Sequence, residues 1–127
     1  MYANGYATYK NNSVNFASKE QLLLMLVDGG VKFAKRAEKA LLEKNIPESH
    51  NNLMKTQDVF TELMASLDTD AGDWAKNMFK VYKFIHSRLV QANVKKDVKI
   101  LREVMPLIID VRDLWYEVYE KAKVQQA

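Results

Sequence analysis

Apolar residues recur at steps of three and four from Ser18 to the end of the chain, and this periodicity predicts an all-helical protein. Turn-forming or helix-breaking residues interrupt the pattern at 45–47, at 68–73 and at 93–97. The interruptions leave four segments of roughly 20 residues, each about 30 Å long as a helix. Such helices, joined by short loops, pack most simply as an antiparallel up-down four-helix bundle. The predicted fold class is therefore all-α, an up-down bundle with an irregular aromatic arm at its N-terminus.

The first helix is predicted to begin at Ser18, because Ser18 and Gln21 have the spacing of a capping box. Its inward stripe includes Gly29 and Gly30, although glycine in a helix interior costs about 1 kcal/mol relative to alanine. Two glycines in a row indicate either a close approach of a neighbouring backbone or a bend. The apolar positions of this stripe are Leu22, Leu26, Phe33, Ala37 and Leu41.

The other helices are predicted at 47–67, at 74–93 and from Asp97 onward, where the Asp97 side chain can act as an N-cap. Pro106 lies inside the last helix and removes a hydrogen bond to the carbonyl of Arg102, which predicts a kink, with a helix break as the second outcome. The inward positions are Leu53, Gln57, Phe60, Leu63, Met64 and Leu67 in the second helix, Trp74, Met78, Tyr82, Ile85, Leu89 and Ala92 in the third, and Leu101, Val104, Ile108, Val111, Trp115, Val118 and Ala122 in the fourth.

The opening residues 1–17 differ from the rest, because they hold aromatic side chains without helical spacing. Tyr2, Tyr6, Tyr9 and Phe16 alternate with asparagines and a glycine, which favours an irregular arm. An arm so rich in aromatic side chains is expected to lie on the bundle or on another surface. The predicted organisation is an N-terminal arm at 1–17 and a helical bundle domain at 18–127.

The fourth helix carries more apolar surface than a simple bundle needs. Between 104 and 119 its apolar side chains extend well beyond the roughly 100° stripe of an ordinary surface helix. The first helix also has an unbroken apolar run at 22–27. One interpretation is a hydrophobic groove that receives a partner helix. The other is that these residues meet only the arm or a second subunit.

Composition and charge narrow the function classes. The chain has 127 residues, 48% of them hydrophobic and 28% charged, which suits one compact globular domain. Nineteen basic residues against 16 acidic ones give a net charge of +3, which is close to balance. Basic groups at Lys32, Lys35, Arg36 and Lys39, and again at Lys95, Lys96 and Lys99, are diluted by Glu38, Glu43 and Asp97, so solvated helix faces are the favoured interpretation. A small basic helical nucleic-acid-binding domain is the alternative function.

The sequence offers little catalytic or metal-binding chemistry. It has no cysteine, and neither His50 nor His86 has a second metal ligand at a recognised spacing. Asp68, Asp70 and Asp73 depart from the calcium-loop pattern at the positions of its glycine and its glutamate. The sequence also has no nucleophile elbow and no glycine-rich phosphate loop. We therefore expect no enzyme, no cofactor and no metal.

Location follows from the same pattern. The longest apolar run is far shorter than the roughly 18 residues of a membrane span, and the first 17 residues lack the features of a secretory signal. We expect no membrane span and a cytoplasmic protein.

Several strings in this order resemble a known family. They are Asn4-Gly-Tyr-Ala-Thr-Tyr9, Ser13-Val-Asn, Ala17-Ser-Lys-Glu-Gln-Leu-Leu-Leu-Met-Leu-Val-Asp-Gly29, Gln57-Asp, Arg88-Leu-Val-Gln-Ala-Asn93, Lys96-Asp97 and Val111-Arg-Asp-Leu-Trp115. Together they resemble the flagellar secretion chaperone FliS family over nearly the whole chain. The chain departs from the family at Val27, where an aromatic residue is usual, and at Pro106.

The resemblance implies a chaperone that binds the C-terminal segment of flagellin, prevents its premature polymerisation and helps to deliver it to the flagellar type III export apparatus. It implies export gate components and a co-chaperone as further partners, no nucleic acid, and a monomer or weak homodimer. It also makes Tyr6 and Tyr9 candidates for flagellin binding, in an arm that can cover the groove when no client is bound. With the apolar track on the first, third and fourth helices, the candidate partner-binding residues are Tyr6, Tyr9, Val14, Leu23, Val27, Tyr82, Leu107, Ile108, Val111 and Trp115.

Overall fold

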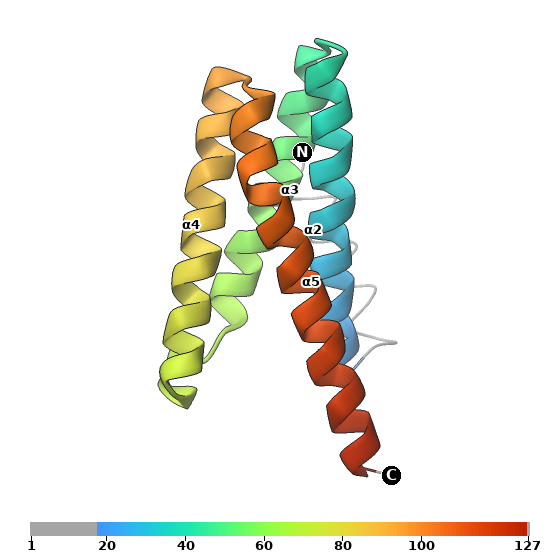
Figure 1. The fold of residues 1–127 in the computed structure, drawn as a ribbon, viewed down its shortest axis with the longest axis vertical. Helices are drawn as coiled ribbons and strands as arrows, with labels where there is room; N and C mark the ends of the chain where they lie inside the picture. Colours follow the sequence, from blue (N-terminus) through green and yellow to red (C-terminus); the bar gives the residue numbers. More distant parts are fainter. Residues whose placement is uncertain (1–17, 127) are drawn as a thin grey trace.

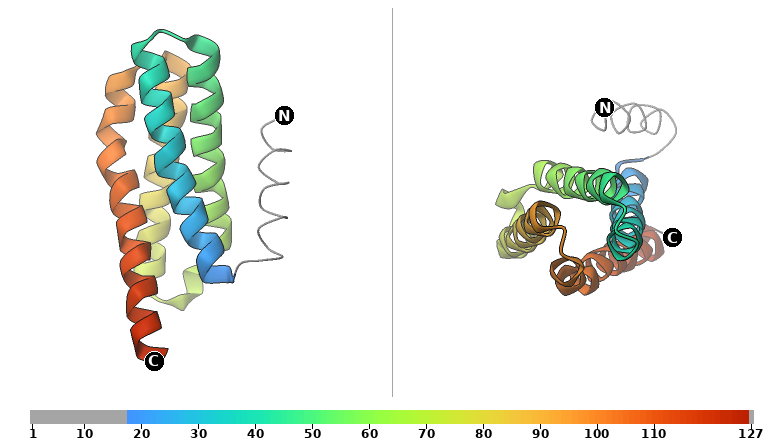
Figure 2. Two further views of the ribbon diagram at one scale, coloured as in Figure 1. Left: turned by 90° about the vertical axis from the view of Figure 1, so that its right-hand side faces the viewer. Right: turned by 90° about the horizontal axis from the view of Figure 1, so that it is seen from above.

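The computed structural model describes residues 18–126 and contains four long helices in this part of the chain (Figure 1). They are α2 (Lys19–Leu42), α3 (Ile46–Ser66), α4 (Asp73–Lys95) and α5 (Val98–Gln126), and a short 3-10 helix, η1 (Thr69–Ala71), precedes α4. The arm predicted at 1–17 lies outside the described residues. Successive helices run in opposite directions, as the two views of Figure 2 also show. The predicted all-α up-down bundle is therefore confirmed.

Each helix packs against two others around the bundle. α2 contacts α3 and α5, α4 contacts α3 and α5, and the diagonal pairs α2–α4 and α3–α5 make no such contact within the described residues. The core lies in the middle of this square arrangement. No helix in the described part of the chain has the length and apolarity needed to cross a membrane.

Three of the four long helices begin at side-chain caps, whereas α4 begins after Gly72 without one, although the composition of 68–73 had suggested a cap. Ser18 Oγ accepts a hydrogen bond from the Gln21 amide at 3.2 Å, and Gln21 Oε1 accepts one from the Ser18 amide at 3.0 Å, so the capping box is confirmed. Asn45 caps α3 by accepting from the Glu48 amide at 3.2 Å. Asp97 accepts from the Lys99 amide at 2.9 Å at the start of α5. These caps pair amides that the first turn of a helix leaves without a partner.

Pro106 does not break α5, which continues from Val98 to Gln126. Figure 1 shows an uninterrupted ribbon along this helix. Pro106 has no N–H to donate to the carbonyl of Arg102. Because Pro106 is exposed, water can reach that carbonyl and hydrogen-bond to it instead. Of the two outcomes predicted for this proline, the break is therefore wrong.

The core is built from the predicted stripes, with corrections at their ends. Trp74 and Val118 were predicted to face inward, yet 55% and 44% of their surface is exposed. Ala122 is also exposed, and Leu22 and Phe33 are only partly buried. The largest of the fully buried side chains are Tyr82, Phe60, Leu53, Leu63, Ile85, Leu89, Leu101, Ile108, Val59, Val104, Thr56 and Ser49.

Trp74 and Val118, which were wrongly predicted to be buried, lie where α4 and α5 diverge. Figure 1 shows α4 and α5 side by side at their linked ends and apart at the opposite end, where α5 lies toward α2. The last turns of α5 also extend past the ends of the other helices (Figures 1 and 2). Trp74 and Val118 therefore face no third helix, although their spacing continues the inward stripe.

The two adjacent glycines of α2 have different surroundings. A Cβ at Gly30 would lie 3.3 Å from Val59 Cγ1 and 3.7 Å from Phe60 Cε2, both side chains of α3 in the core. A Cβ at Gly29 would meet Phe33 at 3.6 Å, which is an ordinary contact. Gly30 therefore makes room for the side chains of Val59 and Phe60 between α2 and α3, and the atoms closest to it belong to side chains rather than to the predicted neighbouring backbone.

We predict opposite effects for substitutions at these glycines. Gly29→Ala should raise the free energy of unfolding by about 0.5–1 kcal/mol, because alanine favours the helix and fits the space. Gly30→Val should lower it by about 1–3 kcal/mol through overpacking against Val59. Urea unfolding followed by circular dichroism measures both values. Equal changes in the two variants would contradict the difference in packing.

Candidate partner-binding surface

Four aromatic residues form a chain of contacts from the core to the surface. Phe60 on α3 meets Tyr82 on α4 edge to face, with ring centroids 6.0 Å apart. Trp115 on α5 contacts Tyr82 by a hydrogen bond and meets Trp74 on α4 edge to face, with centroids 6.4 Å apart. Edge-to-face pairs at these distances are favourable beyond the area that they bury. We call Phe60, Tyr82, Trp115 and Trp74 the aromatic chain.

The hydrogen bond in this chain joins α5 to α4 where the two helices diverge. Trp115 Nε1–H donates to the hydroxyl oxygen of Tyr82 at 2.7 Å. Only 1% of Tyr82 is exposed, and burial raises the pKa of its hydroxyl to about 12, while the hydrogen bond from Trp115 acts in the opposite direction. The indole therefore has a satisfied polar atom on its inner side and an apolar face on its outer side.

Exposed apolar side chains flank Trp115 on the facing sides of α4 and α5. Trp74 and Val81 follow one another at a seven-residue step on α4, and they are 55% and 36% exposed. Leu114 and Val118 are four residues apart on α5, with exposures of 39% and 44%. Residues at these spacings share one face of a helix. We call Trp74, Val81, Leu114, Trp115 and Val118 the apolar strip.

The strip is bounded by a salt bridge on the side of the α4–α5 turn. Arg88 on α4 pairs with Glu103 on α5 at 2.8 Å. This pair marks the part of the bundle where the two helices are in contact. Beyond it, toward the start of α4 and the end of α5, the facing positions are apolar and incompletely covered.

Two side-chain contacts attach α5 to α2, one beside the apolar strip and one near the α4–α5 turn. The Tyr116 hydroxyl donates to the Asp28 carboxylate at 2.5 Å, and Arg102 pairs with Glu38 at 3.0 Å. The hydrogen bond to Asp28 is the main cause of a raised pKa at Tyr116, because the neighbouring carboxylate disfavours the phenolate. Because α5 is attached to α2 in this way, the side of α5 that faces α4 stays partly exposed, and the apolar strip lies there.

The structure distributes the predicted partner-binding residues over three environments. Tyr6, Tyr9 and Val14 lie outside the described residues. Leu23, Leu107 and Trp115 are partly exposed. The remaining predicted residues are buried in the core, with exposures of 1–4%, namely Val27, Tyr82, Ile108 and Val111. Of the second group, Leu107 and Trp115 lie on α5 with the apolar strip, whereas Leu23 lies on α2.

Sequence reasoning missed Trp74 and Val81 as candidates for this surface. Trp74 continues the inward stripe of α4, so periodicity assigns it to the core. The one sequence signal against burial is its place in the first turn of the helix, where neighbouring helices need not extend as far. Leu114 lies in the wide apolar band predicted between 104 and 119 and is exposed, whereas Val118 was predicted to face inward, and its exposure is a correction.

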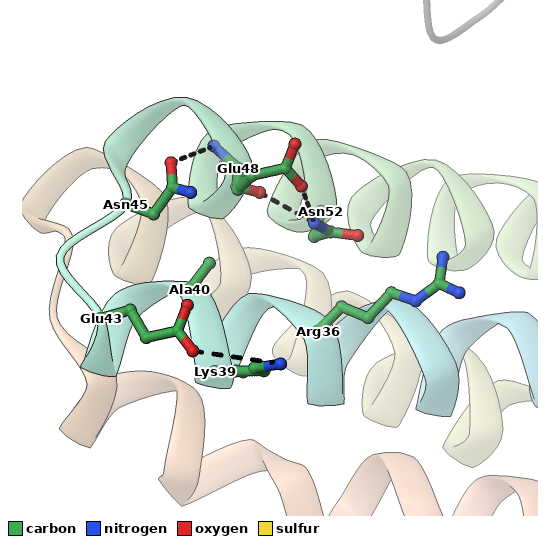
Figure 3. Close-up of a pocket in the computed structure, with 7 residues that line it drawn as sticks. All are labelled: Arg36, Lys39, Ala40, Glu43, Asn45, Glu48 and Asn52. Atoms are coloured by element: carbon green, nitrogen blue, oxygen red, sulfur yellow. Dashed lines mark hydrogen bonds and ion pairs between the residues drawn. The ribbon is translucent and has the colours of Figure 1, made fainter.

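A separate hollow lies between the end of α2 and the start of α3 (Figure 3). Its lining is mostly polar and internally bonded. Asn52 Nδ2 donates to the Glu48 carbonyl at 2.9 Å and to its carboxylate at 3.3 Å, and Lys39 lies 4.0 Å from Glu43. The lining residues are Arg36, Lys39, Ala40, Glu43, Asn45, Glu48 and Asn52.

The chemistry available on the described surfaces suits binding rather than bond making. Within residues 18–126 no three His, Asp or Glu side chains are grouped so that they could hold a metal ion. The apolar strip contains no ionisable side chain, and its main capacity is to bury the apolar face of another helix. Burial of apolar surface contributes about 25 cal/mol per Å².

Comparison with known proteins identifies first the fold and then the family of this chain. A solved structure described as "Crystal structure of flagellar chaperone from bacteria" superposes with a TM-score of 0.73 at 17% identity, over 95% of this chain and 99% of that one. The fold is therefore that of a bacterial flagellar chaperone. The family model described as flagellar protein FliS matches residues 2–122, and the chain belongs to the FliS family.

Relatives from several bacteria carry the name flagellar secretion chaperone FliS. The protein of Bacillus subtilis is 34% identical over 120 residues, which are 94% of this chain and 90% of that protein. The protein of Salmonella typhimurium is 31% identical over 134 residues, covering 100% and 99%. The protein of Escherichia coli is 32% identical over 108 residues, covering 84% and 79%. These matches support a role as a flagellar export chaperone in flagellum biogenesis, and this is not an enzyme family.

We predict that Tyr82→Phe changes the dependence of stability on alkaline pH. The unfolded chain releases the Tyr82 proton near pH 10, whereas the folded protein holds it until about pH 12. This tyrosine thus contributes stability that is present below pH 10 and is lost as pH rises toward 12. Near pH 11 the parent should lose about 1 kcal/mol more than Tyr82→Phe, relative to pH 8.

Urea unfolding at the two pH values measures this difference. All other ionisable groups are the same in the two proteins, so their contributions cancel in the difference. At pH 8 the variant should already be less stable by about 1 kcal/mol, since the indole N–H of Trp115 loses its acceptor. Parallel pH profiles for the two proteins would contradict the assignment.

Proposed function

We propose that this chain binds the C-terminal segment of flagellin, prevents its premature polymerisation and assists its delivery to the flagellar type III export apparatus. In this proposal the client segment folds as an amphipathic helix on the apolar strip. The protein acts in the cytoplasm as a monomer or weak homodimer, and it also meets export gate components and a co-chaperone. Membership of the FliS family supports the general role.

One observation carries the proposed binding mode, namely the exposed apolar strip beside Trp115. Its members occupy facing positions of two helices, which is the arrangement that receives the apolar face of a third helix. A segment that folds on binding loses about 2–5 kcal/mol of its interaction energy to ordering, so it needs an extended apolar track rather than a small pocket. The strip runs along roughly two turns of α4 and about one turn of α5, and it supplies such a track.

The predicted residues fit this proposal in two ways. Leu107 and Trp115 lie at the strip and are available for direct contact. The buried Tyr82, Ile108 and Val111 support the strip from beneath, because they fix the position of α5 in the core. The proposal keeps Tyr6, Tyr9 and Val14 as residues of an arm that exchanges between the bundle and the client.

We predict that substitutions on the strip weaken client binding. Trp74→Ser combined with Val118→Ser removes two exposed apolar side chains that the client would bury, so the dissociation constant for a flagellin C-terminal peptide should rise at least about tenfold. Calorimetry measures the constant. Because the contact is apolar, the affinity of the parent should change by less than about threefold when the salt concentration is raised tenfold.

A matched control is available at the other end of α4. Val94 is 75% exposed and lies outside the strip, so Val94→Ser should leave the affinity unchanged. Equal affinity for the strip variant and the control would overturn the proposed surface. A steep loss of affinity with salt would instead indicate a binding mode dominated by charge, as in the nucleic-acid alternative.

We predict that the arm affects the same equilibrium. Deletion of residues 1–17 should tighten peptide binding if the arm only covers the strip, since the fraction of open molecules then rises. If the arm contacts the client directly, the deletion and the double substitution Tyr6→Ala/Tyr9→Ala should both weaken binding. Calorimetry with the same peptide distinguishes the two roles, and parent-like binding by both variants would remove the arm from recognition.

A further inference from the structure

The outward face of α2 carries four basic side chains on two adjacent turns. Lys32, Lys35, Arg36 and Lys39 occupy positions i, i+3, i+4 and i+7, which lie on one face of a helix. All four are exposed. We call these four residues the basic stripe, and its length along the helix axis is about 10 Å.

Two carboxylates of α2 near this stripe are directed toward α5, and only Glu38 has its charge neutralised there, because the partner of Asp28 is a neutral hydroxyl. From the sequence, Glu38 was expected to dilute the basic group. In the structure Glu38 is directed to α5, where it pairs with Arg102 at 3.0 Å. Asp28, one turn before Lys32, accepts the hydrogen bond of Tyr116. Among residues 18–126, the one ion pair of the stripe joins Lys39 to Glu43, 4.0 Å apart at its end.

The remaining basic side chains keep their charges available. Lys32, Lys35 and Arg36 form no ion pair with any described residue. The ammonium of Lys32 lies 5.7 Å from the centre of the Phe33 ring, so an aromatic surface adjoins the stripe. Figure 3 shows the Arg36 side chain extending away from Lys39 and Glu43, along the open side of the hollow between α2 and α3.

We propose that the basic stripe docks an acidic helix of a partner protein other than the flagellin client. A helix with Glu or Asp at i, i+4 and i+7 presents its carboxylates over the same two turns that the stripe spans. The planar guanidinium of Arg36 can bind one carboxylate with two hydrogen bonds, which fixes the register more closely than the lysines do.

A nucleic-acid duplex fits the same surface less well. Its phosphates extend far beyond a stripe of two helical turns and would approach the carboxylates at its margins. Glu43 lies at one end of the stripe, Glu38 lies on the side of α5, and Glu48 lies across the hollow. An acidic helix of limited length avoids these groups and still reaches all four basic side chains.

The stripe is separate from the apolar strip. α2 and α4 are diagonal in the bundle, so their backbones do not approach each other closely, and the stripe lies on the side of α2 that faces away from the core. An acidic partner on α2 and an apolar client on α4 and α5 therefore occupy different faces. Their binding should be independent.

The test uses a synthetic alanine-based helical peptide with glutamates at i, i+4 and i+7, and a counterpart in which glutamine replaces each glutamate. The full chain should bind the glutamate peptide in a fluorescence anisotropy titration at low salt, and the glutamine peptide at least about tenfold more weakly. Binding should also weaken strongly when the ionic strength is raised to about 0.3 M.

The charge reversal Lys32→Glu/Arg36→Glu should weaken binding of the glutamate peptide at least about tenfold. The matched control Lys76→Glu/Lys80→Glu makes the same charge change at the same spacing on the exposed surface of α4, and it should retain parent affinity to within about twofold. Equal losses in the two variants would overturn the proposal, because net charge rather than the stripe would then be responsible.

Two further measurements separate the proposal from its alternatives. Tighter binding of a short DNA duplex than of the glutamate peptide, lost in Lys32→Glu/Arg36→Glu, would overturn it in favour of nucleic acid. The same variant should bind the flagellin C-terminal peptide like the parent. Loss of flagellin binding in a folded variant would overturn the proposal, because the stripe would then belong to the client site. The role of the apolar strip is tested separately by Trp74→Ser combined with Val118→Ser.

Discussion

The length of α5 imposes the main constraint on this molecule. With 29 residues against 23 in α4 and 24 in α2, it cannot be covered along its whole length by antiparallel neighbours. Near the turn it pairs with α4 through Arg88 and Glu103, and farther along Tyr116 attaches it to α2. Its α4-facing side is consequently only partly covered beyond the salt bridge, by contacts of Trp115 with Tyr82 and Trp74. Trp115 partly fills the divergence, since its indole donates a hydrogen bond inward to Tyr82 and presents apolar surface outward.

The elements of the fold were predictable because they depend on local chemistry. The capping box at Ser18, the cap at Asn45 and the cap at Asp97 each use residues within four positions of one another, so spacing alone defines them. The glycine pair was also informative, because close packing of two helices is one of the few reasons to keep glycine inside a helix. The structure then assigned that role to Gly30.

The candidate surface was less predictable, because exposure depends on where neighbouring helices end. Trp74 and Tyr82 belong to the same stripe of α4, yet one is 55% exposed and the other 1%. Periodicity gives the direction in which a side chain projects, and it gives no information on whether another helix lies there. For the same reason the predicted partner-binding set combined core residues such as Ile108 with surface residues such as Leu107. The excess apolar surface on the fourth helix was evident from the sequence, but its limits depend on how far α4 and α2 extend beside it.

Charge shows the same dependence on tertiary contacts. Along the sequence Glu38 lies between Arg36 and Lys39 and balances them, whereas in three dimensions it faces α5 and pairs with Arg102. A helix that packs between two neighbours can therefore carry balanced charge overall and strongly unbalanced charge on its outward face. The contacts that attach α5 to α2 do two things at once. They direct Asp28 and Glu38 toward α5, where Arg102 neutralises Glu38, and by holding α5 away from α4 they leave the apolar strip only partly covered. The apolar and the basic surfaces of this bundle thus have a common origin in the packing of α2 against α5.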